Sequence, residues 1–212
     1  MKTIYCISGL GADQRIFKKL SISDVKLVGV DWLRPDWHDE IPCYAQKMSA
    51  QIPGEAPIII GVSFGGMLAS EIIRMRPDAK VIIISSAKDV TELPRVGRFL
   101  RIVAKSHLAP VGVMKIPSKQ VDERFGAETE EEKTLLHSIL KDTDNHFSRW
   151  AFKAMVNWKT AVHDPRIIHI HGTADRMIPS ENIQPTHWIE GGHHLMVYSR
   201  ADEVSRLIAQ HL

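Results

Sequence analysis

Cysteine is scarce in this chain, and its scarcity excludes two structural classes. Only Cys6 and Cys43 occur among the 212 residues, and they do not form a C-x-x-C pair. Two thiols cannot supply the disulfide framework of a small secreted domain or the four ligands of a zinc ribbon. Each cysteine lies in an apolar segment, so we expect both to be buried free thiols.

Long apolar runs are absent as well. No stretch approaches the roughly 20 consecutive apolar residues that a membrane-spanning helix needs. The N-terminal run at residues 4–7 is also shorter than the roughly 7–15 apolar residues of a secretory signal. We therefore expect no membrane partner and a cytoplasmic location.

The chain has no excess of charge of either sign. Its 27 basic and 25 acidic side chains leave a formal charge of +2 and are scattered along the sequence. This balance gives no electrostatic reason to expect a nucleic-acid partner. The length and the 44% of hydrophobic residues predict a single globular domain over residues 1–212. Nothing in the sequence indicates an oligomeric state.

What the chain does contain is an alternation of strand and helix patterns. The strand candidates are short runs rich in β-branched residues, at 4–7, 25–30, 57–62, 81–84, 166–171 and 187–190. Helical patterns lie between and after them, at 39–52, 64–75 and 199–210. This rhythm predicts an α/β fold in three layers, with an open, mostly parallel sheet and helices on both faces.

Residues 94–160 interrupt the alternation, because they contain helical patterns only. Thr129 and Glu132 have the spacing of a capping box at a helix start. Ser199 and Asp202 have the same spacing ahead of the last helix, and we expect the same cap there. We predict a helical insertion at 94–160, after the strand at 81–84.

The pattern Gly-Val-Ser-Phe-Gly at residues 61–65 lies between an apolar strand and an amphipathic helix. A G-x-S-x-G pattern at a strand-to-helix turn is typical of a nucleophile elbow. The turn holds its serine in a strained conformation, and Gly61 and Gly65 are needed where neighbouring chains crowd. The N–H of Phe64 then lies at a helix N-terminus, which favours an anion. The sequence predicts Ser63 as a nucleophile.

A serine hydroxyl needs an adjacent base at neutral pH. With 11 histidines in the chain, position must decide between them. His193 and His194 follow the last strand and precede the last helix, so they lie at the carboxyl edge of the sheet together with Ser63. In open α/β sheets this edge is where ligands bind. Both histidines are candidates for the base.

An acidic partner is expected at the same edge. Asp175 follows the strand at 166–171, within the segment His-Gly-Thr-Ala-Asp-Arg-Met-Ile-Pro. A buried carboxylate that accepts the imidazole N–H fixes the tautomer and stabilises the imidazolium formed during attack. Asp89, which follows the strand at 81–84, is the alternative acid.

The order Ser63, Asp175, His194, with G-x-S-x-G, H-G-x-x-D-x-x-I-P and a terminal glycine–histidine turn, resembles the α/β-hydrolase superfamily. The resemblance covers nearly the whole chain except the insertion. It implies a trimmed α/β-hydrolase fold of about six strands with a helical lid at 94–160. The family turn Gly-x-Gly-His aligns the base with His194, while a Gly192-His193 alignment keeps His193 as the alternative.

The resemblance also implies an oxyanion hole formed by the N–H groups of Phe64 and Leu10. Leu10 lies in the loop Ser-Gly-Leu-Gly at 8–11, where Ser8 replaces a histidine frequent in the family. The implied activity is hydrolysis of an ester or related acyl bond of a small-molecule substrate through an acyl-Ser63 intermediate, without a cofactor. A serine at position 63 disfavours dehalogenase chemistry, for which this fold uses aspartate.

Other functions remain open at this point. The same fold can serve as a small-molecule receptor or a partner-binding module without turnover. An enzyme with this site could also act on thioesters, lactones, peptides or C–C bonds. His169 and His171 alternate on one strand face, but no third ligand follows at a useful spacing. We therefore expect no metal site.

Overall fold

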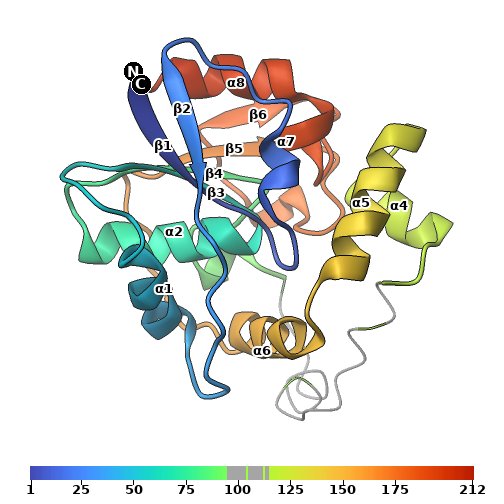
Figure 1. Cartoon of the computed structure of the whole chain (residues 1–212), viewed down its shortest axis with the longest axis horizontal. Helices are drawn as coiled ribbons and strands as arrows, with labels where there is room; N and C mark the ends of the chain where they lie inside the picture. Colours follow the sequence, from blue (N-terminus) through green and yellow to red (C-terminus); the bar gives the residue numbers. More distant parts are fainter. Residues whose placement is uncertain (95–103, 105–111, 113–114) are drawn as a thin grey trace.

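The computed structural model describes residues 1–94, 104, 112 and 115–212 (Figure 1). Its strands form one sheet in the order β2-β1-β3-β4-β5-β6, and every neighbouring pair is parallel. The strands are β1 (Lys2–Ile7), β2 (Val25–Gly29), β3 (Ile58–Val62), β4 (Lys80–Ile84), β5 (Ile168–Gly172) and β6 (His187–Ile189). The predicted α/β class and sheet are confirmed.

Helices cover both faces of this sheet (Figure 1). One face packs against α1 (Ile41–Ser49), α2 (Phe64–Met75) and α6 (Asn145–Val156). The other face packs against η1 (Gln14–Phe17), α7 (Met196–Ser199) and α8 (Ala201–Ala209). The remaining described helices are η2 (Val90–Glu92), α4 (Lys119–Phe125), α5 (Glu130–Asp142) and η4 (Ser180–Asn182).

Side-chain alternation along the central strands divides the core into two clusters. In β3, Ile59 packs with the α1–α2 side, whereas Ile60 and Val62 pack with the α8 side, and all three are at most 4% exposed. Strands buried on both faces have few polar positions, which explains their continuous apolar runs. Each such side chain contributes roughly 1.5–3 kcal/mol through burial.

Between β4 and β5 the described residues form helices α4, α5 and α6 and no strand. This arrangement agrees with the predicted helical insertion at 94–160, although residues 95–103, 105–111 and 113–114 of it lie outside the described residues. The capping box at the start of α5 is present. The Thr129 hydroxyl accepts the N–H of Glu132 at 3.2 Å, and the Glu132 carboxylate accepts the N–H of Thr129 at 3.0 Å.

Two local predictions are wrong. Ser199 does not cap the last helix: it ends α7, its hydroxyl donates to the Leu195 carbonyl at 3.4 Å, and α8 begins after a break at Arg200. Cys43 is exposed, whereas Cys6 is buried. The helical period of α1 turns Ile41, Tyr44, Ala45 and Met48 toward the core and leaves Cys43 on the outer side.

The described helices include none with the length and apolar content needed to cross a bilayer. In this parallel sheet β1 and β3 are neighbours and β4 separates β3 from β5, so the carboxyl ends of β1, β3 and β5 lie at the same edge. The loops that follow these three strands carry Leu10, Ser63 and Asp175. The topology therefore brings the predicted site residues to one edge.

Candidate active site

Ser63 sits between the end of β3 and the first turn of α2, with φ 52° and ψ −120°. A non-glycine residue with positive φ is strained and is held only by its surroundings. Here the Ser63 N–H donates to the Ile84 carbonyl at 3.0 Å. The Ser63 carbonyl accepts the Ser86 hydroxyl at 2.6 Å and the Gly66 N–H at 2.9 Å. Neighbouring β4 and the segment after it thus fix the turn.

The two glycines of the elbow are required by close backbone contacts. A Cβ on Gly61 would lie 2.4 Å from the Gly65 carbonyl oxygen, and a Cβ on Gly65 would lie 2.2 Å from the Ser8 carbonyl oxygen. Real Cβ atoms do not approach backbone this closely. The crowding predicted from the sequence is confirmed. Glycine at these positions allows the start of α2 to pack directly against the end of β1.

The structure brings Ser63, His194 and Asp175 together. His194 Nε2 lies 3.0 Å from Ser63 Oγ, and His194 Nδ1 lies 2.8 Å from Asp175 Oδ2. Because a carboxylate only accepts, Nδ1 carries the proton of a neutral ring, and Nε2 is left to accept from the Ser63 hydroxyl. This is the geometry of a nucleophile, a general base and an orienting acid.

The loop that follows β5 closes around the Asp175 carboxylate. Its Oδ1 accepts the N–H groups of Met177 at 2.8 Å and Ile178 at 2.9 Å. Burial raises the pKa of this carboxyl, but His194 and the Ile178 N–H outweigh that effect, so the net pKa lies below its ordinary value. Asp175 therefore remains an anion beside His194.

His194 is positioned by the end of α4. The N–H of Leu195 donates to the Phe125 carbonyl at 3.0 Å, and the Phe125 ring lies edge-on to the His194 ring at 5.8 Å. A Cβ on Gly126 would lie 2.0 Å from the Cβ of His193, so the end of α4 lies directly against this histidine turn. Glycine at position 126 permits the contact.

The alternative base and acid have other partners. His193 is half-buried, not exposed as a turn residue would be, and lies 3.0 Å from the Ala174 carbonyl and 3.4 Å from Glu128. Asp89 accepts the N–H and hydroxyl of Thr91 at 2.7 and 2.5 Å and lies 3.0 Å from His163. Within the described ranges, neither residue contacts Ser63 or His194 through a polar atom.

The loop after β1 passes directly beside the serine. A Cβ on Gly9 would lie 3.3 Å from Ser63 Cβ and 3.9 Å from Ser63 Oγ. In the part of the chain that the structure describes, the N–H groups of Leu10 and Phe64 have no hydrogen-bond acceptor. Unpaired N–H groups on the residues that follow Gly9 and Ser63 are suited to a developing oxyanion.

Sequence reasoning missed the groups that hold this loop. The Thr143 hydroxyl, at the end of α5, donates to the Gly11 carbonyl at 2.7 Å. The Ala12 carbonyl accepts from the Ser8 hydroxyl at 2.7 Å and from Trp32 Nε1 at 2.8 Å. No local pattern signals a contact between residues 11 and 143, which are far apart in the chain.

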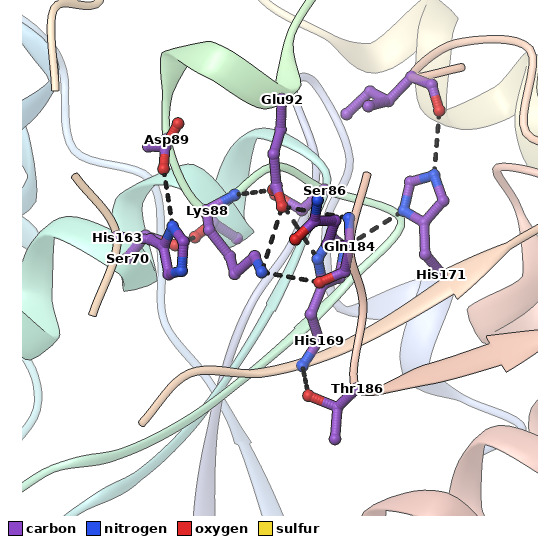
Figure 2. Close-up of polar contacts among 12 residues, drawn as sticks. Ser70, Ser86, Lys88, Asp89, Glu92, His163, His169, His171, Gln184 and Thr186 are labelled. Atoms are coloured by element: carbon purple, nitrogen blue, oxygen red, sulfur yellow. Dashed lines mark hydrogen bonds and ion pairs between the residues drawn. The ribbon is translucent and has the colours of Figure 1, made fainter. Parts of the chain in front are cut away.

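A second polar cluster, drawn in Figure 2, is buried near Asp175, since His171 Nε2 lies 3.9 Å from Asp175 Oδ2. It contains His171, His169, Glu92 and Lys88, each at most 8% exposed. His169 and His171 share a strand face as predicted, and their Nε2 and Nδ1 atoms lie 3.2 Å apart. The described residues include no group of three or more side chains arranged to hold a metal ion.

A parallel sheet whose central strand runs into a sharp serine turn and then a helix defines the α/β-hydrolase class of fold. The chain belongs to the alpha/beta hydrolase family, whose model matches residues 6–207. This membership confirms the resemblance found in the sequence and supports hydrolase activity. A search of curated protein sequences gives no significant match to the chain.

Solved structures share the fold at low sequence identity. An esterase from Exiguobacterium antarcticum superposes with a TM-score of 0.78 at 15% identity, covering 100% of this chain and 91% of that one. A bromoperoxidase from Bacillus anthracis gives 0.72 at 12%, covering 99% and 91%. The N-acyl homoserine lactonase AidH, complexed with N-butanoyl homoserine, gives 0.66 at 16%, covering 100% and 88%. At these identities the similarity concerns the fold.

Proposed function

We propose that this protein is a serine hydrolase that cleaves an ester or related acyl bond of a small-molecule substrate. The observation that carries the proposal is the unbroken chain of contacts from Ser63 Oγ through His194 to Asp175, at 3.0 and 2.8 Å. A serine on a strained turn, a histidine within hydrogen-bond distance and a buried carboxylate together make an activated nucleophile. A serine without such a base would be a weak nucleophile.

Acylation begins when Ser63 Oγ attacks the acyl carbon while His194 Nε2 takes the hydroxyl proton. The N–H groups of Leu10 and Phe64 stabilise the tetrahedral oxyanion, and each donor of this kind typically contributes about 10²–10³ in rate. Collapse of the intermediate breaks the bond to the leaving group, which takes the proton from His194. An acyl-Ser63 ester remains.

Deacylation repeats these steps with water. His194 removes a proton from water, and the resulting hydroxide attacks the carbonyl carbon of the acyl-enzyme. The second oxyanion accepts hydrogen bonds from the same two N–H groups. Collapse releases the acid and returns the proton to Ser63. Side chains and N–H groups of this chain supply every step.

Two further features are in line with this proposal. Two of the structurally similar proteins are an esterase and an N-acyl homoserine lactonase, and these names denote hydrolysis of an ester and of a lactone. The helices between β4 and β5 lie beside the site, since the end of α4 contacts the His194 turn. We propose that this segment acts as the lid of the substrate pocket.

The direct test is labelling with a fluorophosphonate, which reacts covalently with activated serines. Wild-type protein should be labelled at Ser63, and Ser63→Ala should not be labelled. Short-chain nitrophenyl esters should be turned over by the wild type and not by Ser63→Ala. A folded wild-type protein that takes no label at Ser63 contradicts the proposal. Stabilisation by small ligands without Ser63-dependent turnover would instead indicate a receptor.

A further inference from the structure

Ile178 is held at both of its backbone polar groups. Its N–H donates to Asp175 Oδ1 at 2.9 Å, and its carbonyl oxygen lies 3.0 Å from His171 Nε2. Asp175 uses its other oxygen, Oδ2, on His194. His171 Nε2 is itself 3.9 Å from Asp175 Oδ2, which is too long for a hydrogen bond. His171 therefore reaches the carboxylate through Ile178.

The contacts fix the proton positions on both strand histidines. A carbonyl oxygen only accepts, so His171 must carry a proton on Nε2. Burial lowers the pKa of His171, so its ring is neutral and Nδ1 can only accept. The partner at 3.2 Å is His169 Nε2, which must then be the donor. The two rings form a directed chain that ends on the Ile178 carbonyl.

His169 is not explained by stability alone. Burial lowers its pKa well below the ordinary value and outweighs the opposing effect of the Ser86 backbone, so the ring is neutral. Because Nε2 holds the proton, the second nitrogen, Nδ1, carries a lone pair. Among the described residues Nδ1 has no hydrogen-bond partner, and it faces Glu92 Oε2 at 3.9 Å. A buried unpaired nitrogen is unfavourable. An apolar side chain, like the buried Ile170 next to it in β5, would avoid it.

We propose that His169 and His171 are positioning residues for Asp175: His171 anchors Ile178, and His169 fixes the His171 tautomer that can do so. The inference rests on the proposed function, in which Asp175 orients the base. The inference adds two hydrogen-bonded histidines in the core of the sheet to the three proposed site residues Ser63, His194 and Asp175. The pair does not touch substrate, so it acts only through the carboxylate.

A buried ion pair between Lys88 and Glu92 lies at the His169 end of the histidine pair (Figure 2). Lys88 Nζ lies 3.2 Å from Glu92 Oε1 and donates to the Gln184 carbonyl at 2.7 Å. Glu92 Oε2 also accepts the Lys88 N–H at 2.7 Å. The ionisable groups near the histidine pair are thus Glu92 and Lys88 on one side and Asp175 and His194 on the other.

Leucine and glutamine variants separate the proposed role from packing. Leucine fills the space of histidine but has no donor, whereas glutamine retains an N–H₂ near the position of Nε2. His171→Leu should lower kcat on a nitrophenyl ester by about 10–100-fold with KM changed less than about threefold, because a displaced acid misorients the base. His171→Gln should recover most of this loss. Each kcat is calculated per active site, and the concentration of active sites is determined by titration with a fluorophosphonate.

His169 should show the same pattern more weakly. His169→Leu should lower kcat by about 3–10-fold, and the double leucine variant should be no worse than His171→Leu, because one residue acts through the other. His163→Leu is the matched control. It removes another histidine next to a buried carboxylate, Asp89, and kcat should not change. Leucine variants with kcat within twofold of wild type overturn the inference.

A second measurement does not depend on turnover. The proton that His194 Nδ1 shares with Asp175 should give a far-downfield proton NMR signal in the wild type. The signal should shift or exchange faster in His171→Leu and remain in His171→Gln. An unchanged signal in every variant also overturns the inference. A wild type without Ser63-dependent turnover but with a signal sensitive to His171 contradicts only the proposed function. If His171→Leu does not fold, His169→Leu and the glutamine variants provide the same test.

Discussion

The two halves of the candidate site are built differently. On the acid side, Asp175 is held by N–H groups of its own loop and backed by His171 and His169, which are fully buried on β5. On the oxyanion side, the loop that carries Leu10 is held by Thr143 from α5 and by Trp32. The acid side belongs to the core of the sheet, and the oxyanion side depends on the inserted helices.

This difference indicates which half of the candidate site is more sensitive to changes in the inserted helices. Side chains packed on both sides of a strand have one arrangement, so Asp175 is placed by the same contacts that stabilise the sheet. The Leu10 loop is tied to α5 at the surface, where Arg15 pairs with Asp142 at 2.8 Å and both side chains are more than a third exposed. Changes in the insertion should therefore reach the proposed oxyanion hole, and His194 through α4, before they reach Asp175.

The largest effect should come from the acid side. Asp175→Asn keeps the shape but can donate to His194 Nδ1, which favours the tautomer unable to accept from Ser63. A change of this kind lowers kcat by about 10⁴-fold in a serine protease, and we expect a similar loss here. Steady-state kinetics on a nitrophenyl ester check it. If Asp89→Asn causes the larger loss, the acid has been misassigned.

A smaller effect should come from the oxyanion side. Thr143→Val keeps the shape of the side chain but leaves the Gly11 carbonyl without its donor, so the Leu10 loop should loosen. Complete loss of one oxyanion donor costs about 10²–10³ in rate, and we expect roughly a tenfold fall in kcat for a displaced one. Thr143→Ser retains the hydroxyl and should be close to wild type. Equal activity of the two variants would show that the loop does not depend on α5.

The smallest effect concerns stability against pH. His169 and His171 have pKa values below the ordinary one because they are buried. As the pH falls below about 6.5, the unfolded chain binds protons at these residues and the folded chain does not, so the free energy of unfolding should decrease. Each histidine contributes at most about 1.4 kcal/mol per pH unit.

Urea unfolding between pH 7 and about 5 measures this slope in the wild type and in the His169→Gln, His171→Gln double variant. The double variant should have a flatter dependence, since glutamine does not titrate. Parallel curves would show that the two histidines take up protons equally in both states. The result would then count against the proton positions derived from their burial.

The sequence was informative where a local pattern determines the structure. The elbow at 61–65 is predicted because strand, turn and helix are contiguous there. Asp175 and the pair His193 and His194 are indicated by their places after successive strands, and the choice of His194 rests on the family turn. Asp89 follows a strand in the same way, and only the structure shows that its partners are Thr91 and His163.

Other features depend on contacts between distant segments, which no single pattern contains. The hold of Thr143 on Gly11, the support of the elbow by Ser86 and the directed pair of His169 and His171 are of this kind. The exposure of Cys43 was mispredicted because an apolar surrounding sequence does not reveal which side of α1 faces the core.

The positive φ of Ser63 means that this residue, which we propose as the nucleophile, also affects the stability of the protein. A non-glycine residue in such a conformation typically costs about 1–3 kcal/mol. Glycine, which adopts positive φ without that cost, would relax the turn while removing the nucleophile. At position 63, thermal stability therefore favours glycine, whereas the proposed catalysis requires serine. A chain selected only for resistance to heat would be expected to lose its serine there.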